Sequence, residues 1–124
     1  MSRSDLLLDS VKLFYEDPKN LEILKGILEK KSGISLRNLE WFITDYSKKK
    51  NITYQTKSGQ EFVVHCAYKS SLDGYSKKLF DPFCRTQKFE YQGLQTTVAQ
   101  LNFVRWAIIH DVIENIQKLD LHKA

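Results

Sequence analysis

The sequence predicts an α+β fold in a single domain, residues 1–124. Its parts are a helical amino-terminal region, a small antiparallel sheet of about three strands, and a long core helix at the carboxyl end. Apolar residues recur every three or four positions before residue 48 and after residue 96, which is the helical period. Between residues 52 and 69 the apolar period changes to two, as in strands. A length of 124 residues with 42% hydrophobic residues fits one domain with its own core.

The amino-terminal helices are expected at about residues 4–16, 18–32 and 35–48. Ser4 and Ser35 are suitable amino-terminal caps for the first and third helices, and Pro18 suits the first turn of the second. Gly33 follows two lysines and is expected to end the second helix in a left-handed conformation. Asn51 is expected to cap the carboxyl end of the third helix.

The strands are expected at about residues 52–57, 61–69 and 88–92. A turn signal at residues 57–60 should join the first two strands in a hairpin. In the second strand, alternate apolar residues from Phe62 to Tyr68 should face the helices. The third strand should join this hairpin, because two strands alone are marginally stable. Residues 70–87 fit neither period and are expected to form an ordered, irregular connection.

The carboxyl-terminal helix is expected at about residues 96–119. It is apolar around well over half of its circumference, so other elements or a second copy of the chain should cover it. The residues expected in its core or in a dimer contact are Leu101, Val104, Trp106, Ile108, Ile109 and Val112. Arg105 and His110 interrupt the apolar pattern and are interpreted as structural residues.

The positive charge of the chain is concentrated in its middle third. The net charge is +4, but residues 46–91 alone hold nine Lys or Arg against four Asp or Glu, giving +5. Residues 1–45 give −1 and residues 92–124 give 0. A basic surface of this kind attracts a polyanion or an acidic partner without specifying which.

Aromatic and basic residues alternate in the connection at residues 70–87, around a turn signal at Asp81 and Pro82. One interpretation is nucleic-acid binding, with rings stacking on bases and cations neutralising phosphates. In the other, Phe80 and Phe83 fasten the connection to the core. The candidate nucleic-acid-binding residues are Lys48, Lys49, Lys50, Tyr75, Lys77, Lys78, Phe80, Arg85 and Lys88.

Other chemistry has little support in the sequence. Cys66 and Cys84 are too few for a disulfide framework, and together with the histidines they lack the spacing of a zinc site. Neither a phosphate-binding glycine loop nor a hydrolase motif occurs, so we expect no cofactor, no metal and no enzymatic activity. A thiol-dependent enzyme using Cys84 is a minor alternative. Without a signal peptide or a membrane-spanning run, we expect an intracellular protein that does not bind membranes.

Three stretches resemble small proteins of nucleocytoplasmic large DNA viruses, the marseillevirus type most closely. They are SLRNLEWFITDYSKK from Ser35, AYKSSL from Ala67 with YSKKLFDPFCR from Tyr75, and TVAQLNFVRWA from Thr97. The resemblance covers residues 35–115 and implies a viral protein made for a cytoplasmic virus factory and packaged in virions, with nuclear access left open. It implies no catalytic residues.

Together these observations predict a nucleic-acid-associated accessory protein, serving early transcription of the virus. DNA and RNA, single-stranded and double-stranded, are not distinguished, because the sequence contains no helix-turn-helix, zinc finger or RNP signature. The alternative is a homodimeric protein-interaction module that recruits a viral or host partner.

Overall fold

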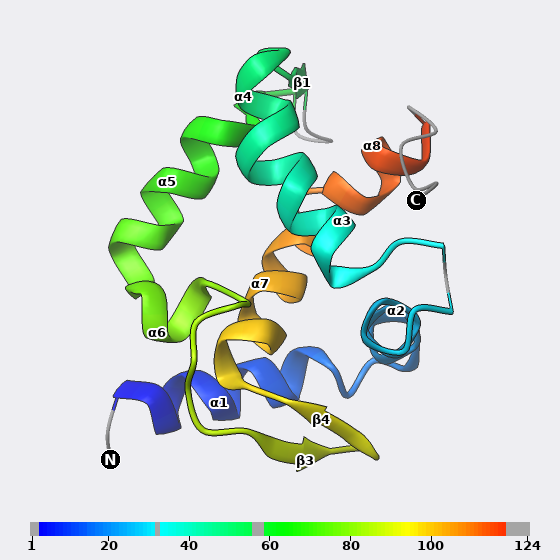
Figure 1. Ribbon diagram of the computed structural model, residues 1–124, viewed down its shortest axis with the longest axis vertical. Coiled ribbons are helices and arrows are strands. Elements are labelled where there is room, and N and C mark those ends of the chain that lie inside the picture. The colour runs from blue at the N-terminus through cyan, green and yellow to red at the C-terminus, as the bar shows by residue number, and fades with distance from the viewer. Residues whose placement is uncertain (1–2, 32, 56–58, 119–124) are drawn as a thin grey trace.

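The computed structural model describes residues 3–31, 33–55 and 59–118, and its architecture is the predicted α+β class. Helix α7 (Val98–Ile109) lies at the centre. Helices α1 (Arg3–Phe14), α2 (Pro18–Leu28), α6 (Lys77–Phe80) and α8 (Val112–Lys118) pack against it (Figure 1). Among the described residues, no helix combines the length and the apolar character needed to cross a bilayer.

Helix α2 begins as predicted and ends earlier than predicted. The Asp17 carboxylate accepts a hydrogen bond from the Lys19 N–H at 3.0 Å, and Pro18 occupies the first turn. At the other end Lys30, not Gly33, adopts the left-handed conformation that closes the helix, with φ 60°. The Lys31 N–H donates to the Gly26 carbonyl at 2.8 Å, which is the closing hydrogen bond of a Schellman motif. The prediction of Gly33 as the cap was therefore wrong.

The third predicted helix is continuous but contains a wider turn. Helix α3 (Leu36–Trp41) leads into the π-helix η1 (Phe42–Tyr46) and then α4 (Ser47–Lys49). The predicted cap at Ser35 is confirmed, since its hydroxyl accepts from the Asn38 N–H at 3.1 Å. The predicted cap at Asn51 is also confirmed, because Asn51 has φ 49° and the Ile52 N–H donates to the Ser47 carbonyl at 3.0 Å.

The second predicted strand is mostly helix. Strand β1 (Thr53–Gln55) pairs antiparallel with β2 (Glu61–Val63), and then α5 (Val64–Tyr75) begins. Val64 and Tyr68, four residues apart, are buried, whereas Cys66 between them is exposed. This burial follows the helical period, so the prediction of a strand over residues 64–69 was wrong. Part of α5 and all of α6 also replace the irregular connection predicted for residues 70–87.

The predicted three-stranded sheet is instead two separate hairpins. Strand β3 (Phe89–Tyr91) pairs with β4 (Leu94–Thr96) and does not join the first hairpin. Gln92 and Gly93 between them have φ 53° and 81°, and positive φ at both positions is the signature of a tight hairpin turn. Strand β4 was missed, because the predicted third strand ended at residue 92, the predicted helix began at about residue 96, and the residues between them were left unassigned.

The long carboxyl-terminal helix is broken at its middle. Helix α7 ends at Ile109, His110 follows, and Asp111 has φ 59°, after which α8 starts. The break has tertiary partners, because the His110 ring stacks on Phe62 with centroids 4.8 Å apart and its carbonyl accepts from the Tyr54 hydroxyl. The predicted stripe reached Leu119, which lies outside the described residues.

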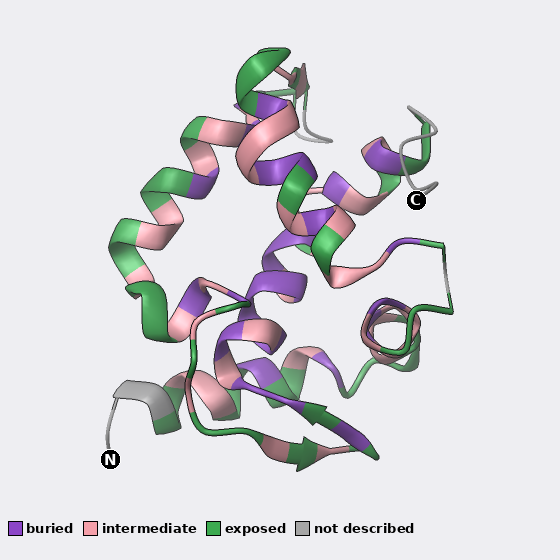
Figure 2. Cartoon of the chain, in the orientation of Figure 1, coloured by how far each residue is buried: buried purple, intermediate pink, exposed green. Residues whose placement is uncertain are grey.

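The core is built around α7 by the chain itself. Leu101, Val104, Trp106 and Val112 are buried, Ile108 is half-buried, and only Ile109 of the predicted contact residues is largely exposed, at 56% (Figure 2). The apolar surface on which the expectation of a dimer rested is thus covered by α1, α2, α6 and α8. Dimerisation stays a prediction.

Candidate nucleic-acid interface

The predicted cationic residues lie in separate parts of the molecule. Lys48, Lys49 and Lys50 stand at the end of α4, and Lys77 and Lys78 stand on α6. Figure 1 shows α4 and α6 at opposite ends of α5, whose 12 residues span roughly 18 Å at 1.5 Å per residue. The predicted set therefore does not form one basic surface.

Two of these cations also have carboxylate neighbours. The Lys49 ammonium lies 3.4 Å from the Asp45 carboxylate, and the Lys77 ammonium lies 4.0 Å from that of Asp81. Near the α4 lysines the pKa of His65 is lowered by burial first, then by the charges of Lys48 and Lys69. The α4 end is thus locally positive, but its charge lies away from α6.

The two predicted aromatic residues, Tyr75 at the end of α5 and Phe80 on α6, stack on each other. Phe80 is 0% exposed and contacts the rings of Phe103 and Trp106 at centroid distances of 5.7 and 5.8 Å. Tyr75 is half-buried and stacks on Phe80 at 5.7 Å. Phe80 therefore anchors the segment, the second of the two roles considered for it, and cannot stack on a base.

Phe83 is the ring that the loop presents to solvent. It is 43% exposed, and the guanidinium carbon of Arg37 lies 5.1 Å from its ring centroid. The sequence interpretation placed Phe80, but not Phe83, among the candidate binding residues, and in its alternative both rings fastened the loop to the core. The fold separates them, because α5 and α7 pack on α6 and enclose Phe80, whereas Phe83 lies beyond α6 and is exposed.

Hydrogen bonds fix the loop that carries Phe83. The Asp81 carboxylate accepts from the Phe83 N–H at 3.0 Å, and the Asp81 carbonyl accepts from the Cys84 N–H at 3.1 Å. Pro82 is buried, and its carbonyl accepts from the Gln100 side chain on α7 at 3.2 Å. Gln100 in turn accepts from the Thr96 hydroxyl at 2.9 Å. The exposed ring therefore stands on a tightly held backbone.

Two adjacent hollows share Phe83 and Gln100 as lining residues. One has a volume of about 370 Å³ and includes Arg85 and Lys88; the other, of about 560 Å³, includes Lys30 and Arg37. Among the residues that the structure describes, no Asp or Glu lines either hollow. We call this region the Phe83 surface, and it comprises Lys30, Arg37, Phe83, Arg85 and Lys88.

Two carboxylates lie near one side of the Phe83 surface. The pKa of Glu40 is raised by burial first and then by Asp81, while Arg37 opposes the shift. Burial raises the pKa of Tyr68 to about 12, with Asp81 and Glu40 adding to the effect. Of the cations on the Phe83 surface, Arg37 is therefore the one that acts on the pKa of Glu40.

Lys30 and Arg37 were missing from the predicted set. They lie in the first third of the chain, where the net charge is negative, and only the tertiary fold brings them beside residues 83–88. No local signal in the sequence reveals them.

The cysteines and histidines do not assemble into a metal site within the described part of the chain, where no group of three potential ligands occurs. Cys66 is exposed and Cys84 is half-buried, and both are free thiols. Cys84 lines the smaller hollow beside Arg85.

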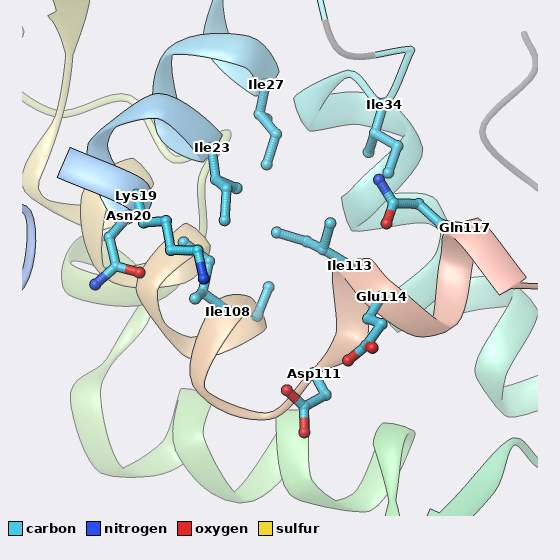
Figure 3. A pocket seen from close by; sticks show the side chains of 11 residues that line it. Lys19, Asn20, Ile23, Ile27, Ile34, Ile108, Asp111, Ile113, Glu114 and Gln117 are labelled. Carbon is cyan, nitrogen blue, oxygen red and sulfur yellow. The ribbon is translucent and has the colours of Figure 1, made fainter. Parts of the chain in front are cut away.

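A third hollow, of different character, lies between α2, α7 and α8. Its volume is about 550 Å³, and Figure 3 shows Ile23, Ile27 and Ile113 pointing toward one another across it. Asp111 and Glu114 carry carboxylates at its edge. We call this region the isoleucine cleft, and its apolar lining consists of Ile23, Ile27, Ile34, Ala107, Ile108 and Ile113.

Comparison with known proteins supports the resemblance to proteins of large DNA viruses. The chain is 38% identical over 125 residues to "Uncharacterized protein L507" of Acanthamoeba polyphaga mimivirus, a giant virus. The match covers 90% of this chain and 48% of that protein, so the chain spans about half the length of this relative. The marseillevirus type stays a prediction, and no solved structure matches. A model of the "Family of unknown function (DUF7197)" matches residues 1–124, and the chain therefore belongs to this family.

Proposed function

We propose that this protein is a non-enzymatic, nucleic-acid-associated accessory protein that contacts phosphates through the Phe83 surface. One observation carries the proposal: an exposed ring on a fixed loop stands between two hollows that bear cations and no lining carboxylate. Cations neutralise phosphates, and an aromatic ring beside them offers a stacking face. The giant-virus relative supports a place in a virus factory or virion, and service in early transcription is the role we propose there.

The proposal differs from the sequence interpretation in the residues it uses. Lys48, Lys49 and Lys50 are left as a remote positive region, and Phe80 has a core role. Arg85 and Lys88 are retained from the predicted set, and Lys30, Arg37 and Phe83 are added to them.

A salt series tests the proposal. If about three phosphates are contacted, log K should fall with log salt with a slope of about −2, or roughly 15-fold between about 50 and 200 mM. Fluorescence anisotropy of a labelled oligonucleotide measures this slope. Replacing Arg85 and Lys88 by Gln should weaken binding and make the slope shallower by about 1.4. Binding that does not respond to salt would contradict the proposal.

The second candidate is a protein-interaction module, and the isoleucine cleft is the observation in its favour. The charged groups beside the apolar floor are the carboxylates of Asp111 and Glu114 and the single ammonium of Lys19, and this net negative charge suits a segment that carries an apolar side chain next to a basic one. The partner proposed here is therefore an amphipathic basic helix of a viral or host protein.

A synthetic helical peptide of leucine and lysine tests the second candidate. Its addition should shift the NMR methyl signals of Ile23 and Ile113, and Glu114→Gln should weaken the effect. Light scattering on the same samples measures whether the chain is a monomer or a dimer. Unshifted methyl signals at millimolar peptide would exclude this cleft as a docking site for such a helix.

A further inference from the structure

We infer that the Phe83 surface binds single-stranded nucleic acid in preference to a duplex. The inference rests on the proposed function, since it names the class of nucleic acid taken by the same site. It is carried by the ring and by the distribution of charge on its two sides.

The exposed Phe83 ring can stack only on a base whose face is uncovered, as it is in an unpaired base. In a duplex the faces of the bases are covered by their neighbours in the stack, and the outside presents phosphates and groove edges. A single strand exposes the faces of its bases, and every base has a π-face that can stack on an aromatic ring. Phe83 offers such a ring at 43% exposure, whereas lysine and arginine alone would bind either form.

The cations lie on both sides of this ring. Arg85 and Lys88 line the smaller hollow, while Lys30 and Arg37 line the larger one, and Phe83 lines both. A strand that crosses the ring therefore meets positive charge before and after the stacked base. This arrangement of a ring within a positive groove is the one that proteins use for single strands.

The guanidinium of Arg37 adds to the stacking surface. It lies 5.1 Å from the centroid of the Phe83 ring, so the cation and the ring already form a pair. The planar guanidinium can stack on a base in the same way as a ring.

The ring is held ready for this contact. Backbone hydrogen bonds to Asp81 and the side chain of Gln100 fix the loop on both sides of Phe83. Binding therefore requires little additional ordering of the protein, which preserves affinity at a site this small. With one ring and two hollows, the site should occupy about two or three nucleotides, well below the usual span of a complete single-strand-binding domain.

Anisotropy with three labelled probes tests the inference: a 12-nucleotide oligo(dT), the matching oligo(U), and a 12-base-pair duplex. At equal salt, the wild-type chain should bind one or both single strands at least about tenfold more tightly than the duplex. The ratio between oligo(dT) and oligo(U) then identifies the sugar preference, and either single strand as the better ligand supports the inference.

Variants at Phe83 separate stacking from charge. Phe83→Leu should weaken single-strand binding at least about fivefold while duplex binding is unchanged, and Phe83→Trp should retain single-strand binding. Trp41→Leu is the matched control, because Trp41 is also exposed but lies on α3 outside both hollows, and it should bind like wild type. Circular dichroism confirms that each variant is folded.

The outcomes distinguish this inference from the proposed function. Salt-sensitive binding with equal affinity for the duplex, or a Phe83→Leu variant that binds the single strand like wild type, would overturn the inference alone. If the wild-type chain binds none of the three probes at about 50 mM salt, the proposed function fails and the inference fails with it.

Discussion

The end of α4 and the Phe83 surface are both basic, but they differ in where their cations lie in the sequence and in what surrounds these cations. Lys48, Lys49 and Lys50 follow one another at the carboxyl end of a helix, where cations favourably oppose the helix dipole. Their presence has a local structural reason. At the Phe83 surface, the cations come from distant parts of the sequence and lie beside a ring that is exposed and not part of the buried core.

This difference is the reason why we propose binding at the Phe83 surface and not at the lysine run. The lysine run was the most visible basic feature of the sequence, and it lies outside both hollows of the Phe83 surface. The following predictions test whether the two regions differ as described.

The largest effect is expected for the two phenylalanines that flank Asp81 and Pro82. Phe80→Ala removes a fully buried ring and should lower the free energy of unfolding by about 3–5 kcal/mol. Phe83→Ala should lower it by less than about 1 kcal/mol, since only the pair with Arg37 is lost. Urea unfolding measures both. Similar losses for the two variants would mean that Phe83 is a core residue and not a binding ring.

A smaller effect is expected from loosening the Phe83 loop. Gln100→Ala removes the hydrogen bonds to the Pro82 carbonyl and the Thr96 hydroxyl and should cost about 1–2 kcal/mol. Amide hydrogen exchange at Phe83 and Cys84 should become faster. Gln55, which is exposed on β1 and lies outside both hollows, provides the control, and Gln55→Ala should leave exchange in the loop unchanged. If exchange is as fast in wild type as in Gln100→Ala, the loop is not held by this residue.

The ionised carboxylate of Glu40, beside the Phe83 surface, should lower the free energy of unfolding at neutral pH. Because burial and Asp81 raise the pKa of Glu40, its ionised form is disfavoured in the folded state. Glu40→Gln should therefore raise stability at pH 7, by less than about 1 kcal/mol for a group this exposed. The difference should vanish as the pH falls below the unperturbed pKa of about 4.3. Thermal unfolding at several pH values measures it, and a gain that persists at pH 3 would rule out this cause.

The smallest effect is expected at the α4 end. The pKa of His65 is lowered by burial and then by Lys48 and Lys69, so Lys48→Gln should raise it part of the way toward about 6.5. Since the folded pKa lies below the unfolded value, His65 contributes to a loss of stability as the pH falls below about 6.5, and Lys48→Gln should reduce that loss. NMR titration of His65 is the measurement. Replacing Arg85 by Gln should leave the pKa of His65 unchanged, because the two regions are separate.

The fold class and most helix starts were predictable because their causes are local. The Ser35 cap, Pro18 at the start of α2 and the left-handed Asn51 are decided by neighbouring backbone groups. The strand predicted beyond Val63 failed because Phe62, Val64 and Tyr68 satisfy a period of two, and only the exposed Cys66 shows that the helical period prevails. The break after Ile109 depends on Tyr54 and Phe62, which lie far away in the sequence.

The candidate site was predictable only in part. Arg85 and Lys88 stand in a basic segment next to a turn signal, so the sequence indicates them. The difference between Phe80 and Phe83 depends on which ring the α5, α6 and α7 helices enclose. Lys30 and Arg37 reach the surface through the packing of α2 and α3, which no spacing of residues reveals.

The most direct test compares two triple variants that each lower the net charge from +4 to +1: Lys30→Gln with Arg85→Gln and Lys88→Gln, and Lys48→Gln with Lys49→Gln and Lys50→Gln. The first should weaken oligo(dT) binding at least about tenfold at about 100 mM salt and make the salt slope shallower by about 2. The second should stay within about threefold of wild type with its slope unchanged. Equal losses in the two variants, or a larger loss in the second, would contradict the assignment of binding to the Phe83 surface.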